Sequence, residues 1–209
     1  MQDMRNNESQ ALCSKEARGN PMSVQKLATV PARISGPVKL DLGCGDNKKD
    51  GFLGVDKFAT ASTDHVFDLL EFPWPVDDGA VEEAHCSHFF EHIPAGKRVP
   101  FMEELYRVLA KGAKAMFITP HAHSDRAIQD FSHEWPPIVP ASYLYFNKGW
   151  RESNKLTHGA YAIGCDYDFG YGYSLDADIT VRNAEYQQFA IKHYNNAASD
   201  LIVTLTKRG

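Results

Sequence analysis

The chain has 209 residues, of which 43% are hydrophobic; this is enough for one full core, so we expect one domain. Its net charge is −5 and it has no basic cluster, which argues against binding bare nucleic acid through the phosphates. No apolar run approaches the ~20 residues of a membrane-spanning helix, and the start of the sequence lacks the apolar core of a signal peptide, so we expect no membrane partner.

The spacing of the cysteines indicates in which cellular compartment the protein is expected. The four cysteines lie far apart in the chain, and none of them forms a Cys-x-x-Cys pair. Reduced thiols in a cytoplasmic protein fit this pattern better than a disulfide framework does.

The first 22 residues differ in composition from the rest. They are polar, and the turn-forming residues Gly19-Asn20-Pro21 lie near their end. We therefore expect a poorly ordered segment over residues 1–22 and a single domain over residues 23–209.

The first predicted strand, residues 38–42, leads into the turn Gly43-Cys44-Gly45. A second predicted strand, residues 52–55, ends in Asp56. Glycines allow tight or left-handed backbone conformations and let a ligand approach the main chain. An acid at the end of the second strand is placed to accept hydrogen bonds from a ribose diol, as in doubly wound nucleotide-binding sheets.

A dinucleotide such as NAD fits this turn poorly. Its fingerprint needs a third glycine three positions after the second, where this chain has Lys48. Asp41, which opens the turn, would repel a pyrophosphate but suits a ligand with a cationic amine. These residues resemble the first motif of the class I S-adenosylmethionine (SAM) dependent methyltransferases.

The resemblance continues, in the correct order, to about residue 120. The further matching segments are a third strand at residues 64–69, a proline-rich loop at 72–79, a fourth strand at 81–87, the segment His88-Phe89-Phe90-Glu91-His92-Ile93, a helix and turn at 103–112, and a fifth strand at 115–119.

The resemblance implies an α/β, Rossmann-like class I methyltransferase fold with a mostly parallel seven-stranded sheet and an antiparallel C-terminal hairpin. For that hairpin we expect strands at residues 186–194 and 201–207, joined by a polar turn. The implied cofactor is SAM, with S-adenosylhomocysteine as the product. The residues implied to bind it are Asp41, Gly43, Cys44, Gly45, Asn47, Lys48, Asp56, Lys57, Asp68, Leu69, Ser87, His88, Phe89 and His92.

The connection between the first two strands departs from the family. Only about ten residues separate Gly45 from Asp56, whereas a crossover usually needs a dozen or more. We expect the intervening helix to be reduced to a turn, so that less helix dipole is available for the ligand carboxylate. Lys48 or Lys49 could supply that charge, or could simply be solvated.

Residues 88–92 also read as His-x-x-Glu-His, the zinc-binding pattern of inverzincin peptidases. That motif needs a continuous helix, and Pro94 follows His92 by two residues. We therefore expect no metal. In the favoured interpretation Ser87 and His88 face the cofactor, and Glu91 and His92 begin a short helix. In the alternative His92 has only a structural role, as a packing or helix-capping residue.

An aromatic-rich insertion is predicted at about residues 121–185, too long for a plain connector. It follows the fifth strand, so we expect it to cover the carboxyl edge of the sheet and to bind the methyl acceptor. His121 and His133 are the candidate general bases, since a neutral imidazole accepts protons near pH 7, although structural hydrogen bonding explains them equally well.

The sequence thus predicts a SAM-dependent methyltransferase with an unidentified acceptor, a small metabolite or sugar being favoured on charge. Two hypotheses from other classes remain: a SAM-binding protein without transferase activity, and a zinc hydrolase. The oligomeric state is left open.

Overall fold

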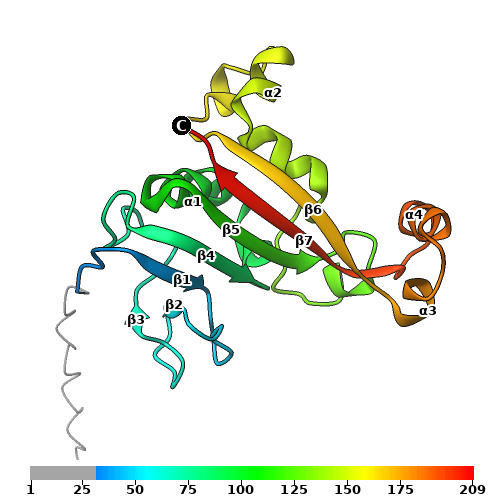
Figure 1. Ribbon diagram of the computed structural model, residues 1–209, viewed down its shortest axis with the longest axis horizontal. Helices are drawn as coiled ribbons and strands as arrows, with labels where there is room; N and C mark the ends of the chain where they lie inside the picture. Colours follow the sequence, from blue (N-terminus) through cyan, green and yellow to red (C-terminus); the bar gives the residue numbers. More distant parts are fainter. Residues whose placement is uncertain (1–31) are drawn as a thin grey trace, which may run out of the picture. The chain divides into compact units, whose positions relative to one another are not determined.

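The computed structural model describes residues 32–209 (Figure 1). The segment predicted over residues 1–22 lies outside the described residues, as do residues 23–31. The described part forms one seven-stranded sheet in the order β3-β2-β1-β4-β5-β7-β6. The strands are β1 (Val38–Leu42), β2 (Leu53–Asp56), β3 (His65–Val66), β4 (Val81–Ser87), β5 (Leu109–Pro120), β6 (Tyr167–Leu175) and β7 (Ala198–Lys207).

Strand directions confirm the predicted fold class. Strands β1 to β5 pair in parallel, and β7 runs antiparallel to both β5 and β6. The order turns around between β1 and β4, where the chain leaves one half of the sheet and begins the other. In open α/β sheets this switch point, at the carboxyl ends of the strands, is where ligands bind.

The predicted C-terminal hairpin is wrong in its first strand. Residues expected to form that strand lie in helix α4 (Ala184–His193). Asn183 caps the helix, because its side chain accepts a hydrogen bond from the Tyr186 amide at 2.8 Å. Lys192 and His193 in the last turn suit the negative end of the helix dipole. The strand that takes its place beside β7 is β6, which lies inside the aromatic-rich segment predicted at about residues 121–185.

Helix α1 (Ala95–Val108) is the crossover from β4 to β5. It begins earlier than the sequence predicts, and β5 follows it directly at Leu109. Gly112, expected in a turn before the fifth strand, lies within β5 with φ at +75°. Its side chains Phe101, Met102 and Leu105 are completely buried, so the helix packs against the sheet and forms part of the apolar core.

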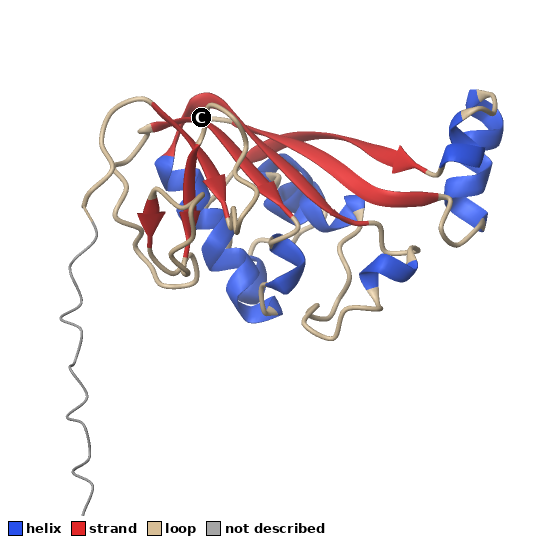
Figure 2. Ribbon diagram, turned by 90° about the horizontal axis from the view of Figure 1, so that it is seen from below, coloured by secondary structure: helices blue, strands red, loops and turns tan. Residues whose placement is uncertain are grey.

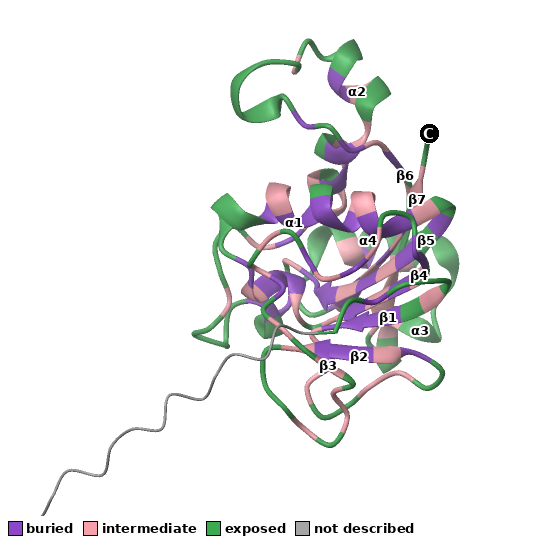
Figure 3. Cartoon of the chain, turned by 90° about the vertical axis from the view of Figure 1, so that its left-hand side faces the viewer, coloured by how far each residue is buried: buried purple, intermediate pink, exposed green. Residues whose placement is uncertain are grey.

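The core lies on one face of the sheet, where Figure 2 shows α1 and the segment that carries α2 (Lys148–Ser153). Its largest fully buried side chains there include Trp74, Phe90, Phe101, Phe117 and Tyr143. On β5, Ala115 and Phe117 are buried, whereas Met116 and Ile118, which point to the other face, are half-buried. Figure 3 shows the central strands mostly buried and α2 mostly exposed, apart from its buried residue Arg151.

The remaining elements are short. They are the 3₁₀ helices η1 (Phe90–His92), η2 (Asp125–Ala127), η3 (Pro140–Phe146) and η4 (Gly159–Tyr161), and helix α3 (Ala177–Thr180), which precedes α4 between β6 and β7. Within residues 32–209 the connection from β1 to β2 contains no helix, as its length predicted. None of the described helices is both long and apolar enough to cross a membrane.

Candidate functional site

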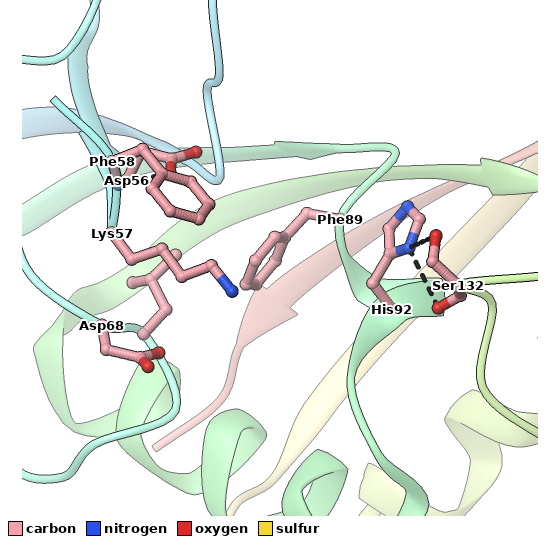
Figure 4. A pocket seen from close by; sticks show the side chains of 8 residues that line it. Asp56, Lys57, Phe58, Asp68, Phe89, His92 and Ser132 are labelled. Atoms are coloured by element: carbon pink, nitrogen blue, oxygen red, sulfur yellow. Dashed lines mark hydrogen bonds between the residues drawn. The ribbon is translucent and has the colours of Figure 1, made fainter. Parts of the chain in front are cut away.

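A pocket of about 380 Å³ lies at the carboxyl ends of the parallel strands. It is lined by the last residue of β2 and by residues that follow β2, β3, β4 and β5, namely Asp56, Lys57, Phe58, Asp68, Leu69, Phe89, His92 and Ser132. In Figure 4, Asp56, Lys57 and Phe58 lie on one side, His92 and Ser132 on the other, and Phe89 between them. The volume suits a small-molecule site, and the position is the ligand-binding edge of open α/β sheets.

Asp56 joins the glycine turn to the pocket. Its Oδ2 accepts a hydrogen bond from the Gly45 amide at 3.0 Å, and its Oδ1 accepts one from the Phe58 amide at 2.9 Å. A carboxylate offers about four lone-pair positions, so two acceptor positions remain for a ligand. These two amides fix the carboxylate at the pocket wall, which is the arrangement that a diol-binding acid needs.

Gly43 is required because Phe89 packs against the turn. Its φ is +71°, and an added Cβ would lie only 2.4 Å from the Phe89 ring. The Gly43 amide donates to the Val55 carbonyl at 2.8 Å, which ties the turn to β2. The turn, β2 and the pocket wall at Phe89 are therefore one packed unit.

Asp41 lies beneath the turn and does not line the pocket. It is 2% exposed, and its oxygens contact the Lys49 amide at 2.8 Å and His85 Nδ1 at 2.7 Å. Sequence reasoning placed this acid against a cationic amine of the ligand. In the structure both of its oxygens have protein partners, one in the turn and one on β4.

The two lysines of the turn have partners within the chain. Lys48 Nζ lies 2.7 Å from Asp64 Oδ2, and this ammonium lowers the pKa of the Asp64 carboxyl. Lys49 Nζ lies 4.7 Å from the centre of the Phe52 ring. Neither lysine is among the residues that line the pocket.

Four further predicted residues lie around the pocket rather than in its lining. Cys44 is buried, with Sγ 3.8 Å from the Ser62 carbonyl oxygen, and burial raises the pKa of its thiol. Asn47 is exposed in the turn, and Ser87 ends β4. His88 has φ at +52°, and the Glu91 carboxylate, 3.3 Å from its Nδ1, raises its pKa.

The two candidate bases separate in space. His133 lies beside the pocket, because its ring packs edge-on against His92 with centroids 4.8 Å apart. His121 lines a different pocket of about 370 Å³, together with His123, Tyr171 and Tyr173. Burial and the neighbouring His123 lower the pKa of His121.

The aromatic segment is not a single cover over the carboxyl edge. Its first part supplies Ser132 to the pocket, Tyr143 packs against Phe90 and Phe117 in the core, and its last part is strand β6. Long-range packing divides it in this way, since aromatic side chains alone do not distinguish a lid from a core strand.

The zinc peptidase arrangement is absent from the described residues. His88 precedes η1, which is a 3₁₀ helix of three residues, and its positive φ breaks any continuous helix through the motif. Glu91 and His92 instead come together with His133, one potential ligand atom of each lying within 4.8 Å of the others.

Phe58 and Ser132 line the pocket but were not among the predicted residues. The sequence does carry a signal for Phe58, because it is an aromatic residue two positions after the acid that ends the second strand. In the structure its side chain is 65% exposed. Ser132 carries none in the local sequence, because only the packing of the segment after β5 brings it to η1.

No protein-family model and no curated protein matches this sequence. Solved structures do share its fold. A SAM-dependent methyltransferase from Archaeoglobus fulgidus matches with a TM-score of 0.57 and 17% identity, over 82% of this chain and 86% of that one. A chain of the complex that holds the Haloferax volcanii Trm112 methyltransferase activator matches with a TM-score of 0.51 and 17% identity, over 84% of each chain.

Proposed function

We propose that this protein, which has the fold of the class I methyltransferases, is a SAM-dependent methyltransferase. The observation that carries the proposal is Asp56: it ends β2, is held by the Gly45 and Phe58 amides, and keeps acceptor positions free at a pocket beside the switch point of the sheet.

The lining residues fit the parts of SAM. Asp56 would accept hydrogen bonds from the ribose diol, and Phe58, Leu69 and Phe89 supply apolar contact area for a flat ring system. NAD fits less well, because the glycine turn leads into β2 without a helix whose N-terminus would hold a pyrophosphate. When bound, SAM supplies a methyl group on a sulfonium that an acceptor nucleophile displaces.

The chain's own contribution is positioning and exclusion of water. Methyl transfer is an in-line displacement, so holding the acceptor against the sulfonium accounts for most of the required catalysis. A base is needed only where the nucleophile must lose a proton. Of the two predicted bases, His133 is the one beside the pocket.

A small metabolite or sugar remains the proposed acceptor, supported by the net charge of −5, which disfavours a phosphate-rich polymer. A cytoplasmic location is supported by Cys44, Cys86 and Cys165, all of which are free and buried.

Calorimetry with SAM, S-adenosylhomocysteine and NAD tests the cofactor assignment. We expect the first two to bind and NAD not to bind; equal binding of NAD would overturn the assignment. A second assay incubates the protein with methyl-labelled SAM and a desalted or metabolite-rich cell extract. Transfer of label supports the enzyme, whereas tight binding without transfer to any fraction identifies a SAM-binding protein.

A further inference from the structure

A buried carboxylate lies at the edge of the pocket without a hydrogen-bond donor. Glu91 in η1 is 6% exposed, and neither side-chain oxygen accepts a hydrogen bond from any residue of the described range 32–209. Removing a charged carboxylate from water without a donor is unfavourable, and buried charges are normally paired or coordinate metals. The environment of Glu91 therefore calls for a cation.

Two histidines face this carboxylate. His92 is the next residue in η1, and His133 comes from the segment after β5. One potential ligand atom of each of the three side chains lies within 4.8 Å of the other two. The two imidazole rings pack edge to face, with their centroids 4.8 Å apart.

Hydrogen bonds set the tautomer of both rings. His133 Nδ1 lies 3.1 Å from the Ala127 carbonyl oxygen, and His92 Nδ1 lies 3.3 Å from the Ser132 carbonyl oxygen. His92 Nδ1 also lies 3.1 Å from Ser132 Oγ, whose own proton is donated to Asp130 Oδ1 at 2.6 Å. All of these oxygens can therefore accept, which favours a proton on each Nδ1 and a lone pair on each Nε2. Histidines that bind metals are usually oriented by such a bond from their other nitrogen.

His88 offers a competing explanation. Its Nδ1 approaches Glu91 Oε1 at 3.3 Å, within ion-pair distance but without hydrogen-bond geometry. The His88 side chain is 40% exposed, and its Nε2 also lies 3.9 Å from Asp200 Oδ1. A protonated His88 could therefore neutralise Glu91, but it does not account for the two histidines gathered beside that carboxylate. His133 Nε2 also lies 3.9 Å from Asp130 Oδ2, which is beyond hydrogen-bond distance.

We propose that Glu91, His92 and His133 bind a first-row divalent transition-metal ion. Two imidazole nitrogens and one carboxylate oxygen form a donor set found in catalytic zinc and non-haem iron sites, and imidazoles disfavour magnesium and calcium. Zinc–ligand bonds of ~2.1 Å place tetrahedral ligand atoms ~3.5 Å apart, so the three side chains must close by about 1 Å. The inference revises the sequence-based expectation that no metal is bound.

The site has a consequence for the acceptor, which rests on the proposed function. Three protein ligands leave coordination positions open, and His92 and Ser132 line the same pocket as Asp56 (Figure 4). A metal there would hold an oxygen of the acceptor and make it a better nucleophile. A metal-bound Nε2 cannot accept a proton, so His133 would not be the general base.

The test uses the full chain and zinc alone, without SAM. After treatment with a chelator and dialysis, zinc binding is measured by calorimetry, and the bound metal is counted by elemental analysis. We expect one zinc ion per chain, and at least a tenfold weaker affinity in Glu91→Gln and in His133→Ala. The control variant His123→Ala should bind zinc within about twofold of the unchanged protein. His88→Gln removes only a neighbour of Glu91, so it should retain zinc with a smaller loss than His133→Ala.

A measurement with cobalt tests the proposal on the unchanged protein, so it does not depend on whether the variants fold. Cobalt in the unchanged protein should give the visible absorption of a four- or five-coordinate site, and zinc should displace it. Absence of stoichiometric zinc and of this absorption would overturn the proposal, as would unaltered zinc affinity in folded Glu91→Gln and His133→Ala. Loss of zinc in His88→Gln with retention in His133→Ala would overturn it too. Because SAM is absent, these outcomes are independent of the cofactor assignment.

Discussion

His85 Nδ1 lies 2.7 Å from Asp41 Oδ1, and the two residues are direct neighbours in the register of β4 and β1. The other Asp41 oxygen accepts the Lys49 amide at 2.8 Å. Asp41 thus links three parts of the fold that the ligand site needs in fixed positions: β1, β4 and the far end of the glycine turn. The switch point of the sheet lies between β1 and β4. Asp41 therefore holds the elements around the site in place without itself lining the pocket.

Replacing Asp41 should destabilise the protein before it affects ligand contacts. In Asp41→Ala the Lys49 amide and the His85 ring lose their acceptor, and a lost buried acceptor costs about 1–3 kcal/mol. Asp41→Asn keeps one oxygen and should lose less. Urea denaturation measures the difference, with the exposed Asp50→Ala in the same turn as the control. A fully stable Asp41→Ala with weakened SAM binding would instead place Asp41 in contact with the ligand.

Asp56→Ala should lower both SAM affinity and stability. Each hydrogen bond from the ribose to this carboxylate is worth about 1.5–3 kcal/mol, so calorimetry should show at least a tenfold weaker affinity. The Gly45 and Phe58 amides also lose their acceptor, so the free energy of unfolding should fall. Asp50→Ala should change neither quantity appreciably. A folded Asp56→Ala with unchanged affinity would show that this acid only ends a strand.

The two glycines of the turn should respond differently to alanine. Both have positive φ, +71° at Gly43 and +51° at Gly45, which costs an alanine about 1–2 kcal/mol. At Gly45 the added Cβ meets open space, whereas at Gly43 it meets the Phe89 ring at 2.4 Å. Thermal denaturation should therefore show a clearly larger loss for Gly43→Ala. Equal losses would mean that Phe89 moves aside freely.

His121 should make stability depend on pH. Burial lowers its pKa below the usual 6.5 in the folded state, so the unfolded chain binds a proton more readily. Its contribution is present above the unfolded pKa and is lost as the pH falls through the folded pKa. Denaturation of the unchanged protein and of His121→Phe between about pH 7.5 and 5.5 measures this. The unchanged protein should lose stability relative to the variant as the pH falls, and parallel curves would contradict the prediction.

The Glu91, His92 and His133 cluster shows how much of the site was accessible from the sequence. The spacing of Glu91 and His92 after β4 was visible, and so was His133 after β5. Their meeting was not, because residues forty positions apart come together only through the packing of the segment after β5 against η1. Local spacing instead suggested His88 as a member of a helical zinc motif, and the positive φ of His88 shows that no continuous helix runs through these residues.

Features that depend on neighbouring residues could be predicted from the amino-acid sequence. The strand, glycine turn, second strand and Asp56 follow from hydrophobic pattern and backbone freedom, and the missing crossover helix follows from chain length alone. Which segment pairs with β7 could not be predicted in this way, because residues 184–193 have a pattern compatible with a strand or a helix until their burial and caps are known. The same holds for the place of Asp41 between the glycine turn and β4, and of Asp56 at the pocket. These features share one cause, since strand pairing and side-chain burial are set by contacts between residues distant in the chain.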